Sequence, residues 1–146
     1  MVTKIQEQDS IVEQNLALTD VITQFGQSWF DKLNRHVDVE NIIEMVSETY
    51  LEMVFSEQTI KDRQEFRQWY KTVGETYYDQ NHTIEKFDVQ ISDAAEIDVV
   101  VVWRAKQRAD DESLAVRVTQ SWIVTQSLTT GLPVITKYVV NSFSDI

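Results

Sequence analysis

Four side chains in this sequence could take part in acid–base or binding chemistry: His36, His82, Arg104 and Arg117. A histidine titrates near neutral pH, so His82, at the start of a predicted strand, is the candidate catalytic base; loop capping is its plainer alternative. His36 is expected at a helix C-terminus, where an imidazole caps the last carbonyl groups. Two isolated histidines without a third ligand at a fixed spacing do not define a metal site, and none is predicted.

The two arginines each interrupt a run of apolar residues in a predicted strand. A guanidinium offers a planar fork of donors, so Arg104 and Arg117 could bind a carboxylate or a carbonyl oxygen inside a pocket. The alternative is that both lie on the outer face of a sheet. There they would pair with acidic residues across strands or at a dimer interface.

Aromatic residues are numerous, with 6 Phe, 5 Tyr and 4 Trp. If they line a cavity, they favour a flat and largely apolar ligand. The alternative is that aromatic residues at helical spacing form an ordinary core. The aromatic residues predicted to line a pocket are Trp29, Phe30, Tyr50, Phe55, Trp69, Tyr70 and Tyr138.

The elements that would position these residues begin with a long amphipathic helix. Ser10 and Glu13 have the spacing of a capping box, and apolar residues then recur at steps of three and four as far as Leu33. Gly26 interrupts this pattern and indicates a bend or a close contact. Residues 1–9 are polar and are predicted to be a flexible N-terminus.

Two shorter helices and a set of strands are predicted next. Asp38 is the expected N-cap of the second helix, residues 59–62 lead into the third, and Tyr50 to Phe55 alternate as a short strand. After His82 the period of the apolar residues changes to that of strands. Four strands are predicted there, over residues 84–91, 97–105, 116–125 and 134–143.

Length and composition fit one soluble α+β domain. The chain has 146 residues, which suits a single domain, predicted over residues 10–146. Helices followed by hairpin-connected strands define the α+β class. A formal net charge of −11 disfavours nucleic acid as a partner.

Other classes of protein are disfavoured by what the sequence lacks. The longest apolar run, residues 99–103, is far shorter than the roughly 20 residues that span a bilayer, so no membrane contact is expected. The N-terminus has no apolar signal segment, and a cytoplasmic location is predicted. With only 3 Gly, a glycine-rich nucleotide loop cannot be drawn, and no cofactor is predicted.

Three segments carry a resemblance to a known superfamily. WFDKLNRHVDVENIIEMVSETYLEMVF, residues 29–55, resembles the NTF2-like pattern of an aromatic residue, a helix end, an Asp-led second helix and a first strand. EFRQWY, residues 65–70, resembles the third helix of that superfamily. TQSWIV, residues 119–124, and PVITKYVV, residues 133–140, resemble its last hairpin. Within it, the chain resembles the SnoaL-like and the uncharacterised bacterial NTF2-like proteins.

The resemblance implies a cystatin-like cone in which N-terminal helices pack into the concavity of a curved antiparallel sheet. It also implies an apolar ligand pocket between helices and sheet, and a homodimer formed through the outer sheet face. Alternation along residues 116–125 places Arg117 and Ser121 on one face and Trp122 on the other. Alignment with the superfamily favours the face of Arg117 and Ser121 as the pocket lining.

The steroid isomerases of this superfamily use a Tyr and two Asp side chains. The corresponding positions of this chain are Phe30, Phe55 and Ser121. None of these supplies the required acid or base, so isomerase chemistry of that type is not expected.

Three functions stay open at this point. The first is the binding of a small, largely apolar ligand in the pocket. The second is a SnoaL-like lyase, isomerase or hydrolase that uses His82 for general acid–base catalysis. The third is a non-catalytic homodimeric interaction module, whose hollow would be filled by its own tryptophans.

Overall fold

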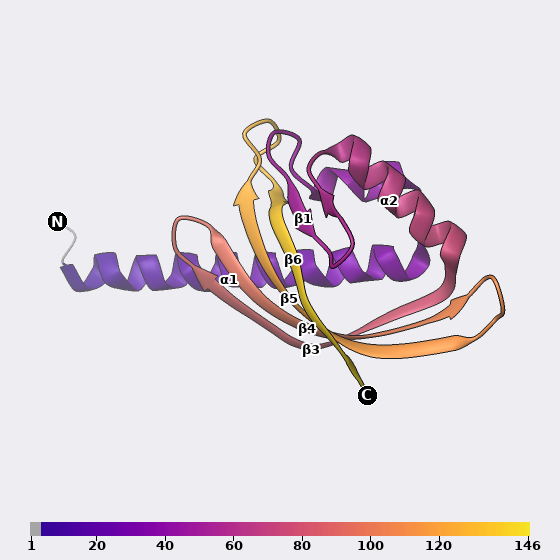
Figure 1. Ribbon diagram of the computed structural model, residues 1–146. Coiled ribbons are helices and arrows are strands. Elements are labelled where there is room, and N and C mark those ends of the chain that lie inside the picture. The colour runs from indigo at the N-terminus through magenta and orange to yellow at the C-terminus, as the bar shows by residue number, and fades with distance from the viewer. Residues whose placement is uncertain (1–3) are drawn as a thin grey trace.

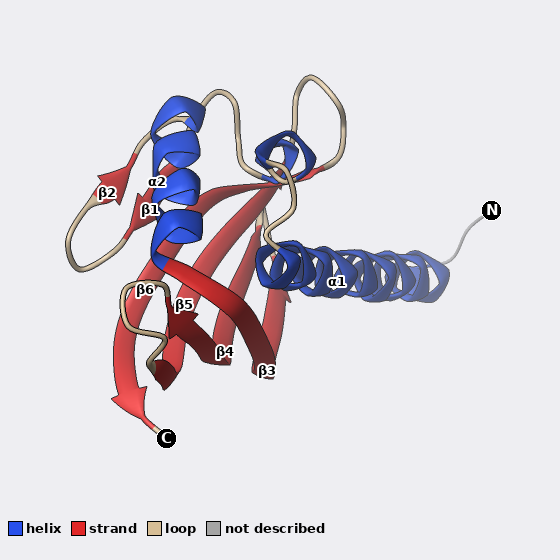
Figure 2. Ribbon diagram, turned by 90° about the vertical axis from the view of Figure 1, so that its right-hand side faces the viewer, coloured by secondary structure: helices blue, strands red, loops and turns tan. Residues whose placement is uncertain are grey.

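The computed structural model describes residues 4–146, with side chains from residue 18 onward. A long helix, α1 (Lys4–Arg35), crosses a curved sheet, and a shorter helix, α2 (Arg63–Thr76), packs on the same side of it (Figure 1, Figure 2). The strands are β1 (Glu52–Val54), β2 (Thr59–Ile60), β3 (Tyr77–Ile91), β4 (Ala95–Gln107), β5 (Ser113–Gln126) and β6 (Pro133–Asp145). The predicted α+β cone is confirmed.

The six strands form one sheet in the order β2-β1-β6-β5-β4-β3. Strands β3 to β6 form the antiparallel meander predicted from the alternation. The short strand predicted over residues 50–55 is β1, and it lies parallel to β6, with Met53 opposite Tyr138. The two-residue β2 was not predicted, because so short a strand carries no periodic signal.

The first helix extends further toward the N-terminus than predicted. Ser10 lies inside α1 and does not begin it, because the Lys, Gln and Glu residues before it are good helix formers and continue the helix. Residues 4–9 of the predicted flexible segment are therefore helical, and residues 1–3 lie outside the described residues. In the described part of the chain, no helix is long and apolar enough to cross a bilayer.

His36 directly follows the last residue of α1, at the predicted helix C-terminus, but its ring does not cap the helix. Its backbone adopts a left-handed φ of 45°, and its N–H donates to the Leu33 carbonyl at 3.1 Å. The imidazole stacks on the ring of Tyr70 in α2, with centroids 4.2 Å apart. Burial and the nearby Arg108 lower the pKa of His36. His36 is therefore a packing residue between the two helices.

The segment between the helices departs partly from the prediction. The short helix expected after Asp38 is a pair of 3-10 turns, Val39–Asn41 and Ile43–Met45, and the Asp38 side chain makes no capping bond. At α2, by contrast, the Asp62 carboxylate accepts from the Glu65 N–H at 2.8 Å. This cap starts α2 close to where the sequence predicted it.

The core between helices and sheet is aromatic. The fully buried Trp29 of α1 contacts Phe66 of α2, Trp122 of β5 and Tyr138 of β6, with ring centroids 6.1, 6.2 and 5.7 Å apart. One side chain therefore joins both helices to the two central strands. Phe30, the next residue, packs on Trp122 at 5.5 Å.

The inner face of β5 is the one opposite to our prediction. Val118, Gln120 and Trp122 point into the cone, whereas Arg117 bonds to Glu85 at 2.6 Å on the outer face. Burying the tryptophan and valines removes much apolar surface from water, and a guanidinium inside the cone would lose its hydration without a carboxylate partner. Homodimerisation through the outer face stays a prediction.

Gly26 marks a close contact, one of the two alternatives predicted for it. A Cβ at this position would overlap the ring of Phe87 on β3, which itself packs edge-on against Trp122. Gly26→Ala should therefore destabilise the protein by about 1–3 kcal/mol through overpacking. At an uncrowded helical site the same change would stabilise by roughly 1 kcal/mol. Urea unfolding measures the sign, with Gln27→Ala at the exposed neighbour as the control; a stabilised Gly26→Ala would contradict the contact.

Candidate functional site

A cavity of about 380 Å³ lies between α2 and the inner face of the sheet. This volume falls within the range of small-molecule sites. Its aromatic lining residues are Phe55, Trp69, Tyr77, Trp103, Tyr138 and Phe143, and its aliphatic ones are Leu33, Val73, Val101, Val118 and Val140. Its polar lining residues are Ser56, Glu57, Gln58, Gln80, His82 and Gln120. The cone pocket, as we call this cavity, is thus mostly apolar with a few polar groups.

The tautomer of His82 is fixed by Asn34 of α1. The Asn34 side-chain oxygen accepts the backbone N–H of His82 at 2.7 Å, and a backbone N–H can only donate. The same oxygen lies 2.8 Å from His82 Nδ1, so Nδ1 must carry the proton. The lone pair is therefore on Nε2, for which the described residues supply no hydrogen-bond partner. His82 presents an acceptor at the pocket wall.

The environment of His82 keeps its ring neutral. Phe30 lies against it at a centroid distance of 5.1 Å, and Trp103 lies nearly parallel to it at 6.3 Å. Burial lowers the pKa of His82 from 6.5 to about 4, because the imidazolium would lose its hydration. Asn34 is uncharged and does not compensate that cost. At neutral pH His82 is thus an acceptor and a weak base.

This low pKa predicts a pH dependence of stability. The unfolded chain takes up a proton at His82 as the pH falls through 6.5, whereas the folded protein does so only near pH 4. Unfolding is therefore favoured progressively across that window, by about 3 kcal/mol in all, and the effect levels off below it. Urea unfolding at pH 7, 5.5 and 4 should show a smaller loss of stability for His82→Phe. Equal losses in both proteins would contradict the buried neutral state, because His36 titrates alike in both.

Two glutamines supply further polar groups at the pocket wall. Gln80 of β3 accepts the indole N–H of Trp103 at 3.2 Å, and Gln120 of β5 accepts that of Trp122 at 2.9 Å. An indole N–H can only donate, so the atom that accepts it is the amide oxygen, and each amide NH₂ is oriented away from the indole.

Of the predicted pocket residues, four line the cone pocket: Phe55, Trp69, His82 and Tyr138. Three others belong to the core beneath it. Trp29, Phe30 and Tyr70 are 0%, 2% and 4% exposed. Tyr70 is further held by its hydroxyl, which donates to the Val37 carbonyl.

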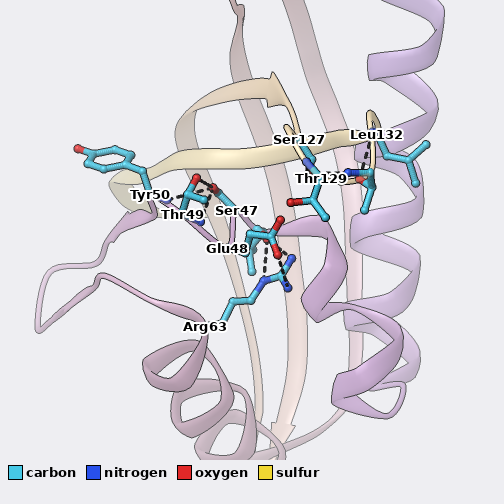
Figure 3. A network of polar contacts seen from close by, with 10 residues as sticks. Ser47, Glu48, Thr49, Tyr50, Arg63, Ser127, Thr129 and Leu132 are labelled. Carbon is cyan, nitrogen blue, oxygen red and sulfur yellow. Dashed lines mark hydrogen bonds and ion pairs between the residues drawn. The ribbon is translucent and has the colours of Figure 1, made fainter.

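The remaining four predicted residues lie away from the pocket. Tyr50 is 62% exposed and points outward from the 47–50 turn, as Figure 3 shows. Arg104 is exposed, Arg117 pairs with Glu85, and Ser121 accepts the Asn141 amide at 2.9 Å on the outer face. The predicted placement of these residues toward the hollow is therefore wrong. The reason is the inverted face assignment on the strands and, for Tyr50, a turn where a strand was predicted.

Figure 3 also shows what holds this turn. The Ser47 hydroxyl accepts the N–H of Thr49 at 3.3 Å and that of Tyr50 at 3.1 Å. Arg63 of α2 donates to the Val46 carbonyl at 2.9 Å and lies near Glu48. These bonds anchor the turn to α2 and direct Tyr50 into solvent.

The sequence reasoning missed several pocket residues. Asn34, which sets the His82 tautomer, lies 48 positions from it, and no local pattern connects the two. Gln80 precedes the predicted start of its strand. Gln120 was predicted to lie on the outer face of its strand. It lies on the same face as Trp122, and the large apolar ring of Trp122 was itself a signal that this face is buried.

The formal charge of the pocket lining is small and negative. Glu57 on the β1–β2 loop is exposed and is the only charged residue among the described lining residues. No group of three metal-ligating side chains converges within the described part of the chain. The described lining residues can therefore hold an apolar molecule and exchange hydrogen bonds with it, but they supply no cation for an anionic group.

No family model and no curated protein matches the sequence. Solved structures do match the fold. An NTF2-like superfamily protein from Salmonella enterica has a TM-score of 0.78 at 10% identity, covering 88% of this chain and 92% of that one. The hexachlorocyclohexane dehydrochlorinase LinA-type3 from Novosphingobium barchaimii has a TM-score of 0.75 at 12% identity, covering 90% and 92%. A ketosteroid isomerase-like protein from Erwinia carotovora atroseptica has a TM-score of 0.69 at 17% identity, covering 84% and 93%.

Helices packed in the concavity of a curved, unclosed sheet define an α+β cone with a pocket between α2 and the sheet. The chain has the NTF2-like fold, as its resemblance to that superfamily predicted. At these identities the likeness establishes the fold alone. The function has to be argued from the pocket.

Proposed function

We propose that this protein binds a small, flat and largely apolar molecule in the cone pocket, and that His82 Nε2 accepts a hydrogen bond from it. The observation that carries this proposal is the fixed lone pair of His82 at the wall of a cavity of about 380 Å³. An acceptor with no partner inside an apolar site favours a ligand that brings a hydroxyl or N–H group.

The aromatic walls favour a flat ligand. Phe55 stacks on Trp69 at 5.2 Å, and Tyr77 meets Trp103 edge-on at 4.9 Å. All four rings line the pocket, so they offer extended apolar surface to a ring system. This open space also favours ligand binding over an interaction module, because Trp29 and Trp122 fill only the core beneath it.

Isothermal titration with 2-naphthol tests the proposal. Naphthol offers a flat ring system and one hydroxyl donor, and 2-methoxynaphthalene is the matched probe without the donor. We expect 2-naphthol to bind about tenfold more tightly than its methyl ether, and His82→Phe to remove that preference while the ether still binds. Failure of both probes to bind, or a preference that survives in His82→Phe, would contradict the proposal.

A second candidate function is general acid–base catalysis by the same histidine. The Nε2 lone pair of His82, a residue that lines the pocket, is the observation in its favour. The low pKa and the uncharged Asn34 oppose it, because the imidazolium formed by proton abstraction is not stabilised. If His82 does take protons from carbon, NMR in heavy water should show deuterium entering the methyl group of added 2-acetylnaphthalene, and His82→Phe should stop it. We expect no such exchange.

A further inference from the structure

The opening of the cone pocket carries a carboxylate that has no cationic partner. Glu57 lies in the loop between β1 and β2, lines the cavity and is exposed, so it marks a place where the cavity meets solvent. The loop is held in place by the Phe55 N–H, which donates to the Gln58 carbonyl at 2.9 Å. No ion pair joins Glu57 to another of the described residues. Its charge is therefore available to a ligand.

Aromatic rings lie next to this carboxylate. Phe55 precedes Glu57 by two residues and stacks on Trp69 of α2, with ring centroids 5.2 Å apart. Both rings are half-buried and line the cavity, and Figure 2 shows the β1–β2 hairpin beside α2. Phe143 of β6 also lines the cavity and is 53% exposed. The faces of such rings carry partial negative charge and attract cations.

The other lining groups do not repel a cation. No lysine or arginine occurs among the described residues that line the cavity. His82 is neutral and directs the lone pair of Nε2, not a proton, away from Asn34. The chain carries a formal net charge of −11, which raises the concentration of cations around the protein. Charge, rings and acceptor at this site therefore all favour a positively charged group.

We propose that the cone pocket selects aromatic compounds that carry an ammonium group, with the ring system inside the cavity and the cation at its opening beside Glu57, Phe55 and Trp69. This inference rests on the proposed function, because the ring system occupies the cavity described there. An ammonium group at the opening keeps part of its hydration, so the cost of its transfer from water is small. A carboxylate at the same place would be repelled both by Glu57 and by the ring faces.

The two ends of the pocket together define the class of ligand. His82 accepts a hydrogen bond from a hydroxyl or N–H group on the ring system, and Glu57 attracts an ammonium group on a side chain. Hydroxyaryl-alkylammonium and indolyl-alkylammonium compounds have both features. Such a ligand gives the neutral acceptor and the carboxylate a partner each.

Titrations with (2-naphthylmethyl)trimethylammonium and 2-naphthylacetate test the selection, since the two probes share one frame and differ in the sign of their charge. We expect the cation to bind about tenfold more tightly than the anion. Glu57→Gln should weaken the cation about three- to fivefold, as loss of an exposed charge pair does. Glu57→Lys should invert the preference, so that the anion binds more tightly than the cation.

Glu75→Lys is the matched control for the charge reversal. Glu75 is an exposed residue of α2 that does not line the cavity, and its replacement changes the net charge of the protein by the same amount. It should leave the affinity of the cation within about twofold, because exposed charges that lie apart are screened by salt. An equal loss in Glu75→Lys and Glu57→Lys would overturn the inference, since net charge and not the carboxylate at the opening would then be the cause.

The proton NMR signal of the ammonium methyl groups gives a readout of the aromatic contact. Ring currents should move it upfield in the complex, and Trp69→Leu should reverse most of that shift. An unshifted signal, or binding of the anion as tight as that of the cation, would overturn the inference and leave the His82 proposal standing if 2-naphthol binds and prefers the wild-type protein. Failure of 2-naphthol and of both charged probes to bind would overturn both.

Discussion

Trp29→Ala should destabilise the protein by about 3–5 kcal/mol, the largest effect that we expect from one side chain. Trp29 is 0% exposed and contacts an aromatic ring in α2, in β5 and in β6. Its removal leaves a cavity at the point where both helices meet the sheet, and the surrounding rings can close it only in part. Thermal unfolding should show a melting temperature lower by roughly 6–20 °C.

Trp69→Ala is the matched control for this result. Trp69 lies on α2 and is half-buried, because one side of its ring lines the cone pocket. From the helical spacing alone, Trp69→Ala would be expected to lower the free energy of unfolding by as much as Trp29→Ala. From the structure we expect a loss of only about 1–2 kcal/mol, since its removal widens a cavity that is already open. Equal losses for the two variants would contradict the assignment of core and pocket.

Asn34→Asp should raise the pKa of His82 from about 4 by roughly 2–3 units. The carboxylate would replace the amide oxygen that lies 2.8 Å from Nδ1, and its charge would stabilise the imidazolium. The substitution keeps the hydrogen bonds to the His82 backbone N–H and to Nδ1, so the tautomer should not change. NMR titration of the His82 ring protons measures the pKa.

Two further variants make this second result interpretable. Asn34→Ala removes the acceptor without adding charge and should leave the His82 pKa low, because desolvation is the cause of the shift. Asp31→Asn alters a carboxylate of α1 that pairs with Arg35 at the surface, and it should not move His82. A His82 pKa in Asn34→Asp equal to that of the wild-type protein would contradict the contact between the two residues.

The fold was predictable because its elements carry periodic signals. The helical spacing through Trp29 and Phe30, and the change of period after His82, indicated helices followed by a meander. The segment over residues 59–62, predicted to lead into a helix, is also followed by α2. The parallel pairing of β1 with β6 was not predictable, because a strand of three residues has too short a pattern to indicate which strand it pairs with.

The pocket was less predictable than the fold, because alternation shows two faces of a strand without saying which is inside. Arg117 and Ser121 were predicted to face the hollow on the basis of alignment. In the structure Trp122 is buried in the hollow, so Arg117 and Ser121 lie on the outer face of β5. The Asn34–His82 pair depends on helix α1 crossing the start of β3. That crossing is a tertiary contact, and no local pattern in either segment encodes it.

A crystal structure of the protein grown with 2-naphthol would decide between an occupied and an unused cone pocket. We predict the naphthalene rings inside the cavity of about 380 Å³, between Trp69 and Trp103, with the hydroxyl about 2.6–3.2 Å from His82 Nε2. An empty cavity at saturating naphthol, or a naphthol hydroxyl turned toward solvent and away from His82, would contradict ligand binding through this histidine.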